Sequence, residues 1–282
     1  MVIFYILIGV LLLLIAVFLY SIAPRWRRNT EPFNHTMFAH RGLHTEDDEA
    51  PENSLASFKR ARLAGYGVEL DIQFTADRQI VVFHDKDLTR MCGVDKRVDS
   101  LTYAELSELT LQGGQEHIPL LQDALDVLGE TPLLCEIKSY GKNSDTSLCE
   151  AAWPLLTKYK GPLCIESFNP FMVQWFRKHQ PQVIRGILST CYDDVDEVTK
   201  LQGFALGALM TNFLTKPDFI AYSFEHRHKF PFILCRYLFR PMTAAWTITD
   251  KEQERTALTT FDTCIFEQYY PTRSQRPSRR NY

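Results

Sequence analysis

Two acidic residues, Glu69 and Asp71, lie two positions apart within the apolar segment 67–72. If this segment is a β-strand, both side chains emerge on the same face. Neighbouring carboxylates repel each other and lose solvation on burial, and a hard cation would offset both costs. A third acid, Glu136, stands near the end of another apolar segment, 132–137. An acid-x-acid pair is more often a solvated strand edge, but three such acids are candidate cation ligands.

Two histidines, His40 and His84, also stand at the ends of apolar segments. A lone histidine at a strand end is usually structural, but imidazole is the side chain best suited to moving protons near neutral pH. Two cations accompany the histidines and acids: Arg41 follows His40 directly, and Lys138 closes the strand that carries Glu136. Together these residues offer cation ligands, two acid or base candidates and two anion binders.

The elements that would position these side chains alternate along the chain between strands and helices. A helix is predicted over 54–65, with Asn53 or Ser54 as its cap and Gly65 as its stop. The candidate strands lie near residues 36–41, 67–72, 79–84, 132–137, 162–167, 183–189, 218–224, 242–248 and 262–267. This alternation favours a mostly parallel sheet, and strands that end in reactive residues are typical of a (β/α)8 barrel. Because nine candidates compete for eight places, one strand must be short or lie outside the barrel.

The order and spacing of these residues resemble the glycerophosphodiester phosphodiesterase family over most of residues 36–250. The motifs that carry the resemblance include His40-Arg41-Gly42, Glu52-Asn53-Ser54, Glu69-Leu70-Asp71, Val82-Phe83-His84-Asp85, Glu136-Ile137-Lys138, Ser167-Phe168 and Trp246-Thr247-Ile248. The resemblance implies a (β/α)8 TIM barrel with a small insertion after the third strand, over residues 86–117. The segment 262–267 departs from the family, which usually closes with a Gly-containing strand ending in Thr-Asp.

The resemblance also implies a reaction, the metal-dependent hydrolysis of glycerophosphodiesters to glycerol 3-phosphate and an alcohol. Glu69, Asp71 and Glu136 would bind one divalent cation, Ca²⁺ or Mg²⁺. Of His40 and His84, one would act as general base and the other as general acid.

The remaining candidate residues would surround that centre. Arg41 and Lys138 would hold phosphate oxygens, Arg41 with its fork of donors. Glu52 would join the metal shell or hold His40, or else only help to start its helix. The aromatic side chains of Phe168 and Trp246 would line the pocket wall or simply pack in the core.

The amino-terminal residues 2–20 are apolar and carry no charge. A bilayer core about 30 Å thick needs about 20 helical residues, so a transmembrane anchor is predicted over residues 1–23. The alternative is a cleaved signal peptide, because Ser21-Ile22-Ala23 resembles a cleavage site. The length of the apolar stretch and the absence of basic residues before it favour the anchor.

Three arginines follow the predicted span directly, at Arg25, Arg27 and Arg28, and no Lys or Arg precedes it. The positive-inside rule therefore predicts that the catalytic domain lies on the cytoplasmic side of the membrane. The rest of the chain is predicted to form a linker, a barrel and a basic disordered tail, over residues 24–35, 36–270 and 271–282.

Composition excludes some other classes of protein. The net charge of −3 argues against a general nucleic-acid binder. The seven cysteines have no C-x-x-C spacing, which argues against a zinc site. No protein partner is inferred. Two alternative functions remain: a lysophospholipase D acting on membrane lysophospholipids, and a catalytically silent, membrane-anchored binding module. No candidate histidine or carboxylate is missing, which argues against the silent module.

Overall fold

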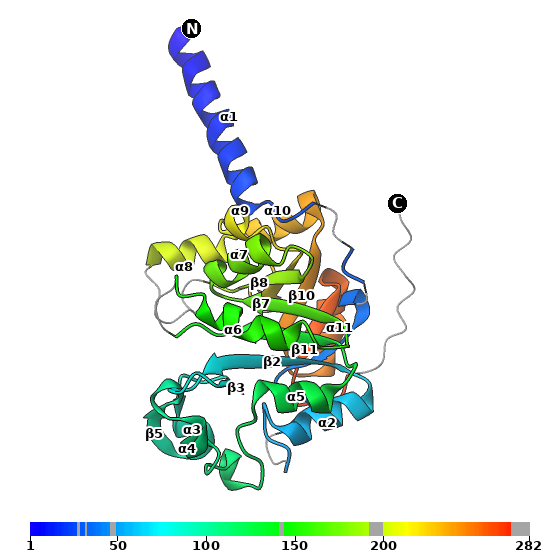
Figure 1. Ribbon diagram of the computed structural model, residues 1–282. Helices are drawn as coiled ribbons and strands as arrows, with labels where there is room; N and C mark the ends of the chain where they lie inside the picture. The colour runs from blue at the N-terminus through cyan, green and yellow to red at the C-terminus, as the bar shows by residue number, and fades with distance from the viewer. Residues whose placement is uncertain (27–28, 32, 46–48, 141–143, 192–199, 272–282) are drawn as a thin grey trace.

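A closed ring of eight parallel strands forms the centre of the computed structural model, which describes all residues except 27–28, 32, 46–48, 141–143, 192–199 and 272–282 (Figure 1). The first strand closes the ring because it pairs with both the second and the last strand. The barrel strands are β1 (Phe38–Ala39), β2 (Gly67–Phe74), β6 (Leu133–Ile137), β7 (Leu163–Ser167), β8 (Ile184–Ser189), β9 (Phe219–Ser223), β10 (Met242–Ile248) and β11 (Thr263–Phe266). The prediction of a (β/α)8 barrel is confirmed.

Helices cover the outside of the ring. They are α2 (Leu55–Ala64), α5 (Leu121–Leu128), α6 (Ser147–Leu156), α7 (Pro170–His179), α8 (Lys200–Gly207), α9 (Asn212–Thr215), α10 (Phe230–Phe239) and α11 (Lys251–Thr260). The first of them, α2, has the predicted ends: the Ser54 side chain accepts a hydrogen bond from the Ser57 amide, and Gly65 ends the helix with a φ of 74°.

One of the nine candidates is not a barrel strand, as predicted. It is the third, 79–84, which forms β3 (Ile80–Val82) and pairs with β2 in the antiparallel direction. The predicted insertion does follow this third strand of the chain, but β3 is not a barrel strand. The insertion comprises β4 (Asp87–Leu88), α3 (Thr89–Cys92), β5 (Val94–Arg97), η2 (Val98–Ser100), α4 (Tyr103–Leu106) and η3 (Leu111–Gly113).

The insertion has an apolar core of its own, separate from that of the barrel. The side chains of Phe83, Leu88, Met91 and Leu106 are buried there together. In Figure 1 the insertion lies beside the end of β2, away from most of the barrel helices. It is therefore a small unit attached to the barrel through the β2–β3 pair.

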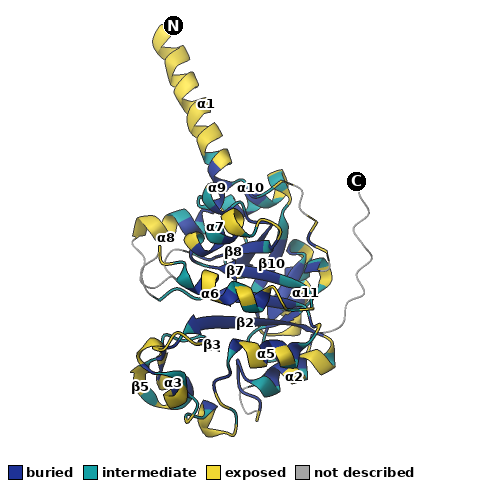
Figure 2. Ribbon diagram, in the orientation of Figure 1, coloured by how far each residue is buried: buried dark blue, intermediate teal, exposed yellow. Residues whose placement is uncertain are grey.

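The barrel core has two layers. One fills the inside of the ring, where Phe38, Leu134, Leu188 and Phe219 are buried together. The other lies between the strands and the surrounding helices, so the strands are buried on both faces (Figure 2). This arrangement fixes the ends of the strands, which carry the candidate site.

At the amino terminus, α1 (Val2–Ile22) extends away from the barrel and is exposed over most of its length (Figure 2). It is long and apolar enough to cross a membrane, a property that a signal sequence near the amino terminus would share.

The predicted linker 24–35 contacts the barrel where it is described. The Arg25 amide donates to the Pro217 carbonyl oxygen at 2.9 Å. Phe33, in the short helix η1 (Phe33–His35), is buried and stacks on Phe38 with ring centroids 6.2 Å apart. The predicted disordered tail covers residues 271–282, and all of it except Pro271 lies outside the described residues.

Candidate active site

The three predicted cation ligands meet at the ends of β2 and β6. Asp71 and Glu136 are register partners on these neighbouring strands, and Glu69 lies two residues before Asp71. One carboxylate oxygen of each residue lies within 4.8 Å of the others, and all three side chains are buried. The structure therefore brings together the three carboxylates that the sequence places on one strand face and one neighbouring strand.

The pKa values of these carboxylates reflect their burial and the charges around them. Burial and repulsion from Asp71 and Glu136 raise the pKa of Glu69 well above its usual value. Burial also raises the pKa of Glu136, to about 7. Asp71 is the exception: burial would raise its pKa, but the charges of Lys138, His84 and Arg41 together hold it well below its usual value. A divalent cation would lower the raised pKa values, and three carboxylate oxygens are the ligands that such cations prefer, so the residues fit a bound metal.

Both predicted phosphate binders contact these carboxylates. Lys138 Nζ lies 2.8 Å from Asp71 Oδ1 and 2.9 Å from Glu136 Oε2. The backbone amide of Arg41 donates to Glu69 Oε2 at 3.0 Å. The side-chain Nε of Arg41 lies 3.6 Å from Asp71 Oδ2. Arg41 adopts a φ of 56°, a left-handed conformation that is uncommon outside glycine and is found at functional sites.

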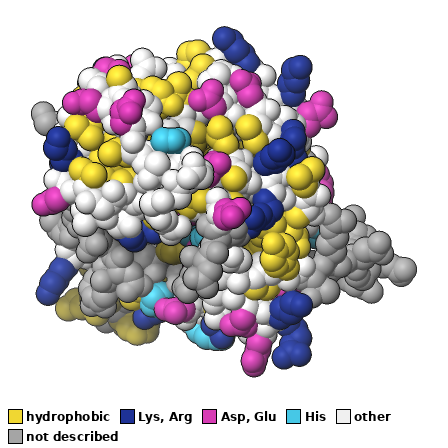
Figure 3. Space-filling model, turned by 90° about the horizontal axis from the view of Figure 1, so that it is seen from below, with side chains coloured by type: hydrophobic (Ala, Val, Ile, Leu, Met, Phe, Trp, Pro, Cys, Tyr) yellow, Lys and Arg dark blue, Asp and Glu magenta, His cyan; other side chains and the backbone are white. Residues whose placement is uncertain are grey.

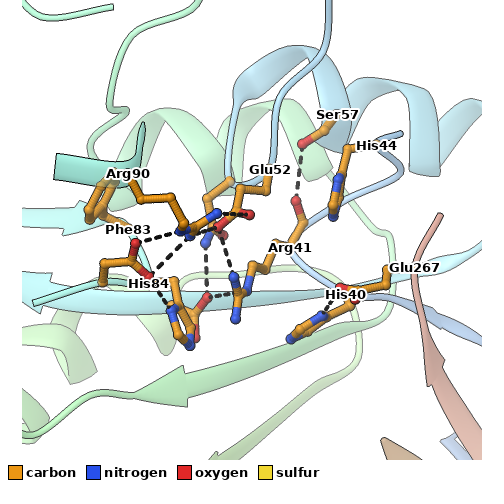
Figure 4. A network of polar contacts seen from close by, with 12 residues as sticks. His40, Arg41, His44, Glu52, Ser57, Phe83, His84, Arg90 and Glu267 are labelled. Carbon is orange, nitrogen blue, oxygen red and sulfur yellow. Dashed lines mark hydrogen bonds and ion pairs between the residues drawn. The ribbon is translucent and has the colours of Figure 1, made fainter. Parts of the chain in front are cut away.

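His84 belongs to a chain of ion pairs on the side of the insertion (Figure 4). Its Nδ1 lies 2.7 Å from Asp85 Oδ1, and Asp85 accepts a hydrogen bond from Arg90 Nε at 2.7 Å. Burial lowers the pKa of His84, and its contact with Asp85 opposes this effect. Although β3 runs antiparallel, its end returns to the site because the Phe83 amide donates to the Asp71 carbonyl oxygen.

Glu52 connects the insertion to the barrel end. It accepts hydrogen bonds from Arg90 Nη1 and Nη2 at 2.8 and 2.7 Å, and from Arg41 Nη1 at 2.8 Å (Figure 4). Despite its burial, these two arginines lower its pKa to about 2. Among the described residues, its ion pairs are with arginines and not with His40.

His40 has a carboxylate partner of its own, Glu267 (Figure 4). His40 Nδ1 lies 2.6 Å from Glu267 Oε2, and its Nε2 lies 3.9 Å from Glu69 Oε2. The hydrogen bond with His40 lowers the pKa of Glu267 against the effect of burial. Sequence reasoning missed Glu267, which directly follows the last strand, β11.

A fourth buried acid, Glu166 on β7, was also missed. It is the register partner of Glu136, and its Oε2 has no hydrogen-bond partner among the described residues. Burial and the charge of Glu136 raise its pKa well above the usual value. Its signal in the sequence was an acid within an otherwise apolar strand.

The two predicted aromatic residues lie together. Phe168 and Trp246 make an edge-to-face contact, with ring centroids 5.4 Å apart, and both pack on the core inside the ring. Both side chains remain partly exposed. Their role as a pocket wall stays a prediction.

Comparison with known sequences gives a consistent result. The profile of the glycerophosphoryl diester phosphodiesterase family matches residues 40–225. A glycerophosphodiester phosphodiesterase of Caldanaerobacter subterraneus is 31% identical over 166 residues, which are 55% of this chain and 67% of that protein. Lysophospholipase D GDPD1 of Rattus norvegicus is 33% identical over 125 residues, 40% of this chain but only 39% of that protein.

Solved structures share the fold. A phosphodiesterase of Oleispira antarctica, in complex with the product sn-glycerol-3-phosphate, superposes with a TM-score of 0.67 at 24% identity, covering 83% of this chain and 93% of that one. A glycerophosphodiester phosphodiesterase of Parabacteroides distasonis gives a TM-score of 0.61 at 25% identity, covering 83% and 92%. The matched sequence, 40–225, contains both histidines and all three carboxylates, but not Glu267.

Proposed function

Because this chain belongs to the glycerophosphoryl diester phosphodiesterase family, we propose that it hydrolyses glycerophosphodiesters to glycerol 3-phosphate and an alcohol. The observation that carries the proposal is the buried group of three carboxylates flanked by two histidines, each paired with a carboxylate of its own. A phosphodiester has one negative charge and poor leaving groups, so its hydrolysis needs charge neutralisation, an activated water and a proton donor.

One divalent cation, Ca²⁺ or Mg²⁺, would be held by Glu69, Asp71 and Glu136. When bound, it would neutralise phosphate charge and stabilise the charge that develops in the transition state. Lys138 and Arg41 already lie against these carboxylates, so their positive charge is available beside the place where a phosphate would bind.

The two histidines would move the protons. A carboxylate can only accept a hydrogen bond, so Glu267 holds the proton of His40 on Nδ1 and leaves Nε2 as the basic nitrogen. His40 would therefore take a proton from the attacking water as its oxygen bonds to phosphorus. His84, paired with Asp85, would give a proton to the departing alcohol oxygen as the phosphorus–oxygen bond breaks.

A product assay on the purified full chain tests this function. Glycerophosphocholine, glycerophosphoethanolamine and glycerophosphoglycerol should each be tried with EDTA, and again after Mg²⁺ or Ca²⁺ is added back. Release of glycerol 3-phosphate that stops in EDTA and returns with a metal is the expected result. Production of no glycerol 3-phosphate from any of them, with either metal present, would contradict the proposal.

A lysophospholipase D activity is the second candidate. It is favoured by the apolar helix α1, which would hold the site near lipid, and by the similarity to proteins named lysophospholipase D. The same assay distinguishes the two activities when lysophosphatidylcholine replaces glycerophosphocholine. Release of choline with lysophosphatidic acid would identify the lipid as substrate.

We also propose that α1 belongs to an anchor over residues 1–23, with the barrel over 36–270 on the cytoplasmic side. The arginines that follow the apolar stretch in the sequence support this side. A cysteine added after Tyr282 should then resist membrane-impermeant labelling in intact cells and react after permeabilisation. Labelling of intact cells would place the barrel outside.

A further inference from the structure

The last turn of α1 is built into the barrel. Ile22 is completely buried and belongs to the main apolar core. Its carbonyl oxygen accepts hydrogen bonds from Asn212 Nδ2 at 2.8 Å and from Cys235 Sγ at 3.4 Å. The next carbonyl, that of Ala23, accepts a hydrogen bond from Lys216 Nζ at 2.9 Å. Side chains of α9, α10 and the residue after α9 thus satisfy carbonyl groups that a helix end normally leaves unpaired.

This arrangement bears on whether α1 is retained. Cleavage after Ser21-Ile22-Ala23, the resemblance noted in the sequence, would remove a fully buried side chain from the core. It would also leave the buried amide of Asn212 without its partner. Both losses are destabilising, so the folded barrel is suited to an uncleaved chain.

The length of α1 sets the distance between the barrel and the membrane. The helix has 21 residues, so it is about 31 Å long, and the hydrocarbon core of a bilayer is about as thick. Tyr20 is still largely exposed, whereas Ile22 is inside the protein. If α1 crosses the bilayer, no length remains for a gap, and the surface around its base must lie at the lipid interface.

That surface is apolar. The helices α9 and α10 lie at the base of α1, and α8 lies further out on the neighbouring side of the barrel (Figure 1). They expose large apolar or aromatic side chains, each at least 46% accessible: Leu201, Phe204, Phe213, Phe230, Tyr237 and Leu238.

The helix α10 is apolar on two faces. Phe232 and Cys235 are buried, and Phe232 stacks on Tyr222 with centroids 4.4 Å apart. The opposite face exposes Phe230 and Tyr237, which lie seven residues apart and so share one side of the helix. A helix on a water-facing surface normally has a polar outer face, and α10 departs from this rule.

The charges in these segments suit an anionic membrane. The stretches 200–217 and 226–240 contain several lysines and arginines and no Asp or Glu. Basic groups gain about 1 kcal/mol each near an anionic leaflet. By contrast, the face seen from the side away from α1 carries side chains of both charges spread among apolar ones (Figure 3).

We propose that α1 is a permanent anchor whose last turn is part of the barrel, and that the exposed face of α8, α9 and α10 rests in the interfacial layer of the same bilayer. The partner of this face is the lipid surface. Because the last turn of α1 is buried in the protein, it leaves no gap between the barrel and the bilayer.

Site-directed fluorescence in liposomes tests the docked face. The full chain, with Cys92→Ser and Cys191→Ser to remove the two partly exposed thiols, is reconstituted in phosphatidylcholine and phosphatidylglycerol. Bimane is attached at Phe204→Cys or Tyr237→Cys, and a nitroxide lipid labelled at its headgroup serves as quencher. The matched control is Leu63→Cys on α2, because Leu63 is also a largely exposed apolar residue but lies on another part of the barrel.

We expect the labels at 204 and 237 to be quenched several-fold more than the label at 63. Equal quenching at all three positions would overturn the docked face. Retention of the anchor is read from the intact mass of the membrane-bound protein, which should include Met1, whereas a chain beginning at Pro24 would refute it. Neither measurement uses hydrolysis, so failure of the proposed function and failure of this inference are distinguishable.

Discussion

The two histidines of the candidate site are held by different parts of the molecule. His40 is paired with Glu267, a residue 227 positions away that follows the last barrel strand. His84 is paired with its neighbour Asp85, which is braced by Arg90 from the insertion. Closure of the barrel thus orients one histidine, and the insertion orients the other. Damage to either region is expected to disable a different half of the proton transfer.

The three carboxylates lie between the two histidines. A change there should impair hydrolysis even when both histidines are intact. Asp71→Asn is expected to lower the rate roughly a thousandfold or more, because loss of the cation removes several kcal/mol of charge stabilisation. The protein should remain folded, since Asn is nearly isosteric with Asp. Hydrolysis and metal binding by equilibrium dialysis measure the effect. Undiminished hydrolysis by the unaltered enzyme in EDTA would remove the metal from the mechanism.

Replacing one histidine at a time separates the two sides. His40→Ala and His84→Ala should each lower the rate by about 10²- to 10⁴-fold, the usual contribution of a positioned acid or base. A substrate whose leaving group has a low pKa needs no proton, so it should rescue His84→Ala and not His40→Ala. The rates of both variants on p-nitrophenyl and alkyl phosphodiesters give the comparison. Equal rescue would leave the assignment of acid and base without support.

Glu52→Gln tests the link between insertion and barrel. Because the pKa of Glu52 falls from 4.5 to about 2 on folding, its contribution to stability is complete above pH 4.5 and disappears as the pH falls towards 2. We expect the substitution to cost about 2–3 kcal/mol near neutral pH. Urea unfolding in detergent, followed at several pH values, should show this difference shrinking below pH 4.5. A difference independent of pH would assign the loss to packing alone.

The smallest effects are expected from the partners of the histidines. Glu267→Gln should lower the rate about 10- to 100-fold, as is usual when a group that orients a functional histidine is lost. Asp85→Asn should lower the pKa of His84 further, because Asp85 opposes the effect of burial. The basic limb of the kcat/KM profile should then move to lower pH in Asp85→Asn. An unchanged profile in that variant would exclude His84 as the acid.

The local part of this architecture could be predicted from the sequence. Glu69 and Asp71 share a strand face, and the strand of Glu136 is apolar, so their convergence follows from the alternation of strands and helices. The direction of β3 could not be predicted, because a short apolar strand reads the same in either direction. Its antiparallel course is set by its pairing with β2.

The contacts made across long distances in the chain were also beyond the sequence. Nothing in the spacing of Arg90 from the other candidate residues indicates that it reaches Glu52. The pairing of His40 with Glu267 depends on the register by which β1 closes against β11. Such pairings come from the three-dimensional ring, whereas periodicity reports only which residues neighbour each other along one element.

The separate core of the insertion has a consequence for how enzymes of this architecture can diversify. Because Leu88, Met91 and Leu106 pack with one another and not with the barrel, the segment can be rebuilt without repacking the barrel core. The β2–β3 pair would have to be kept, together with the contacts of Arg90 with Glu52 and with Asp85. The insertion could therefore be varied between these supports while the barrel and its carboxylates stay unchanged.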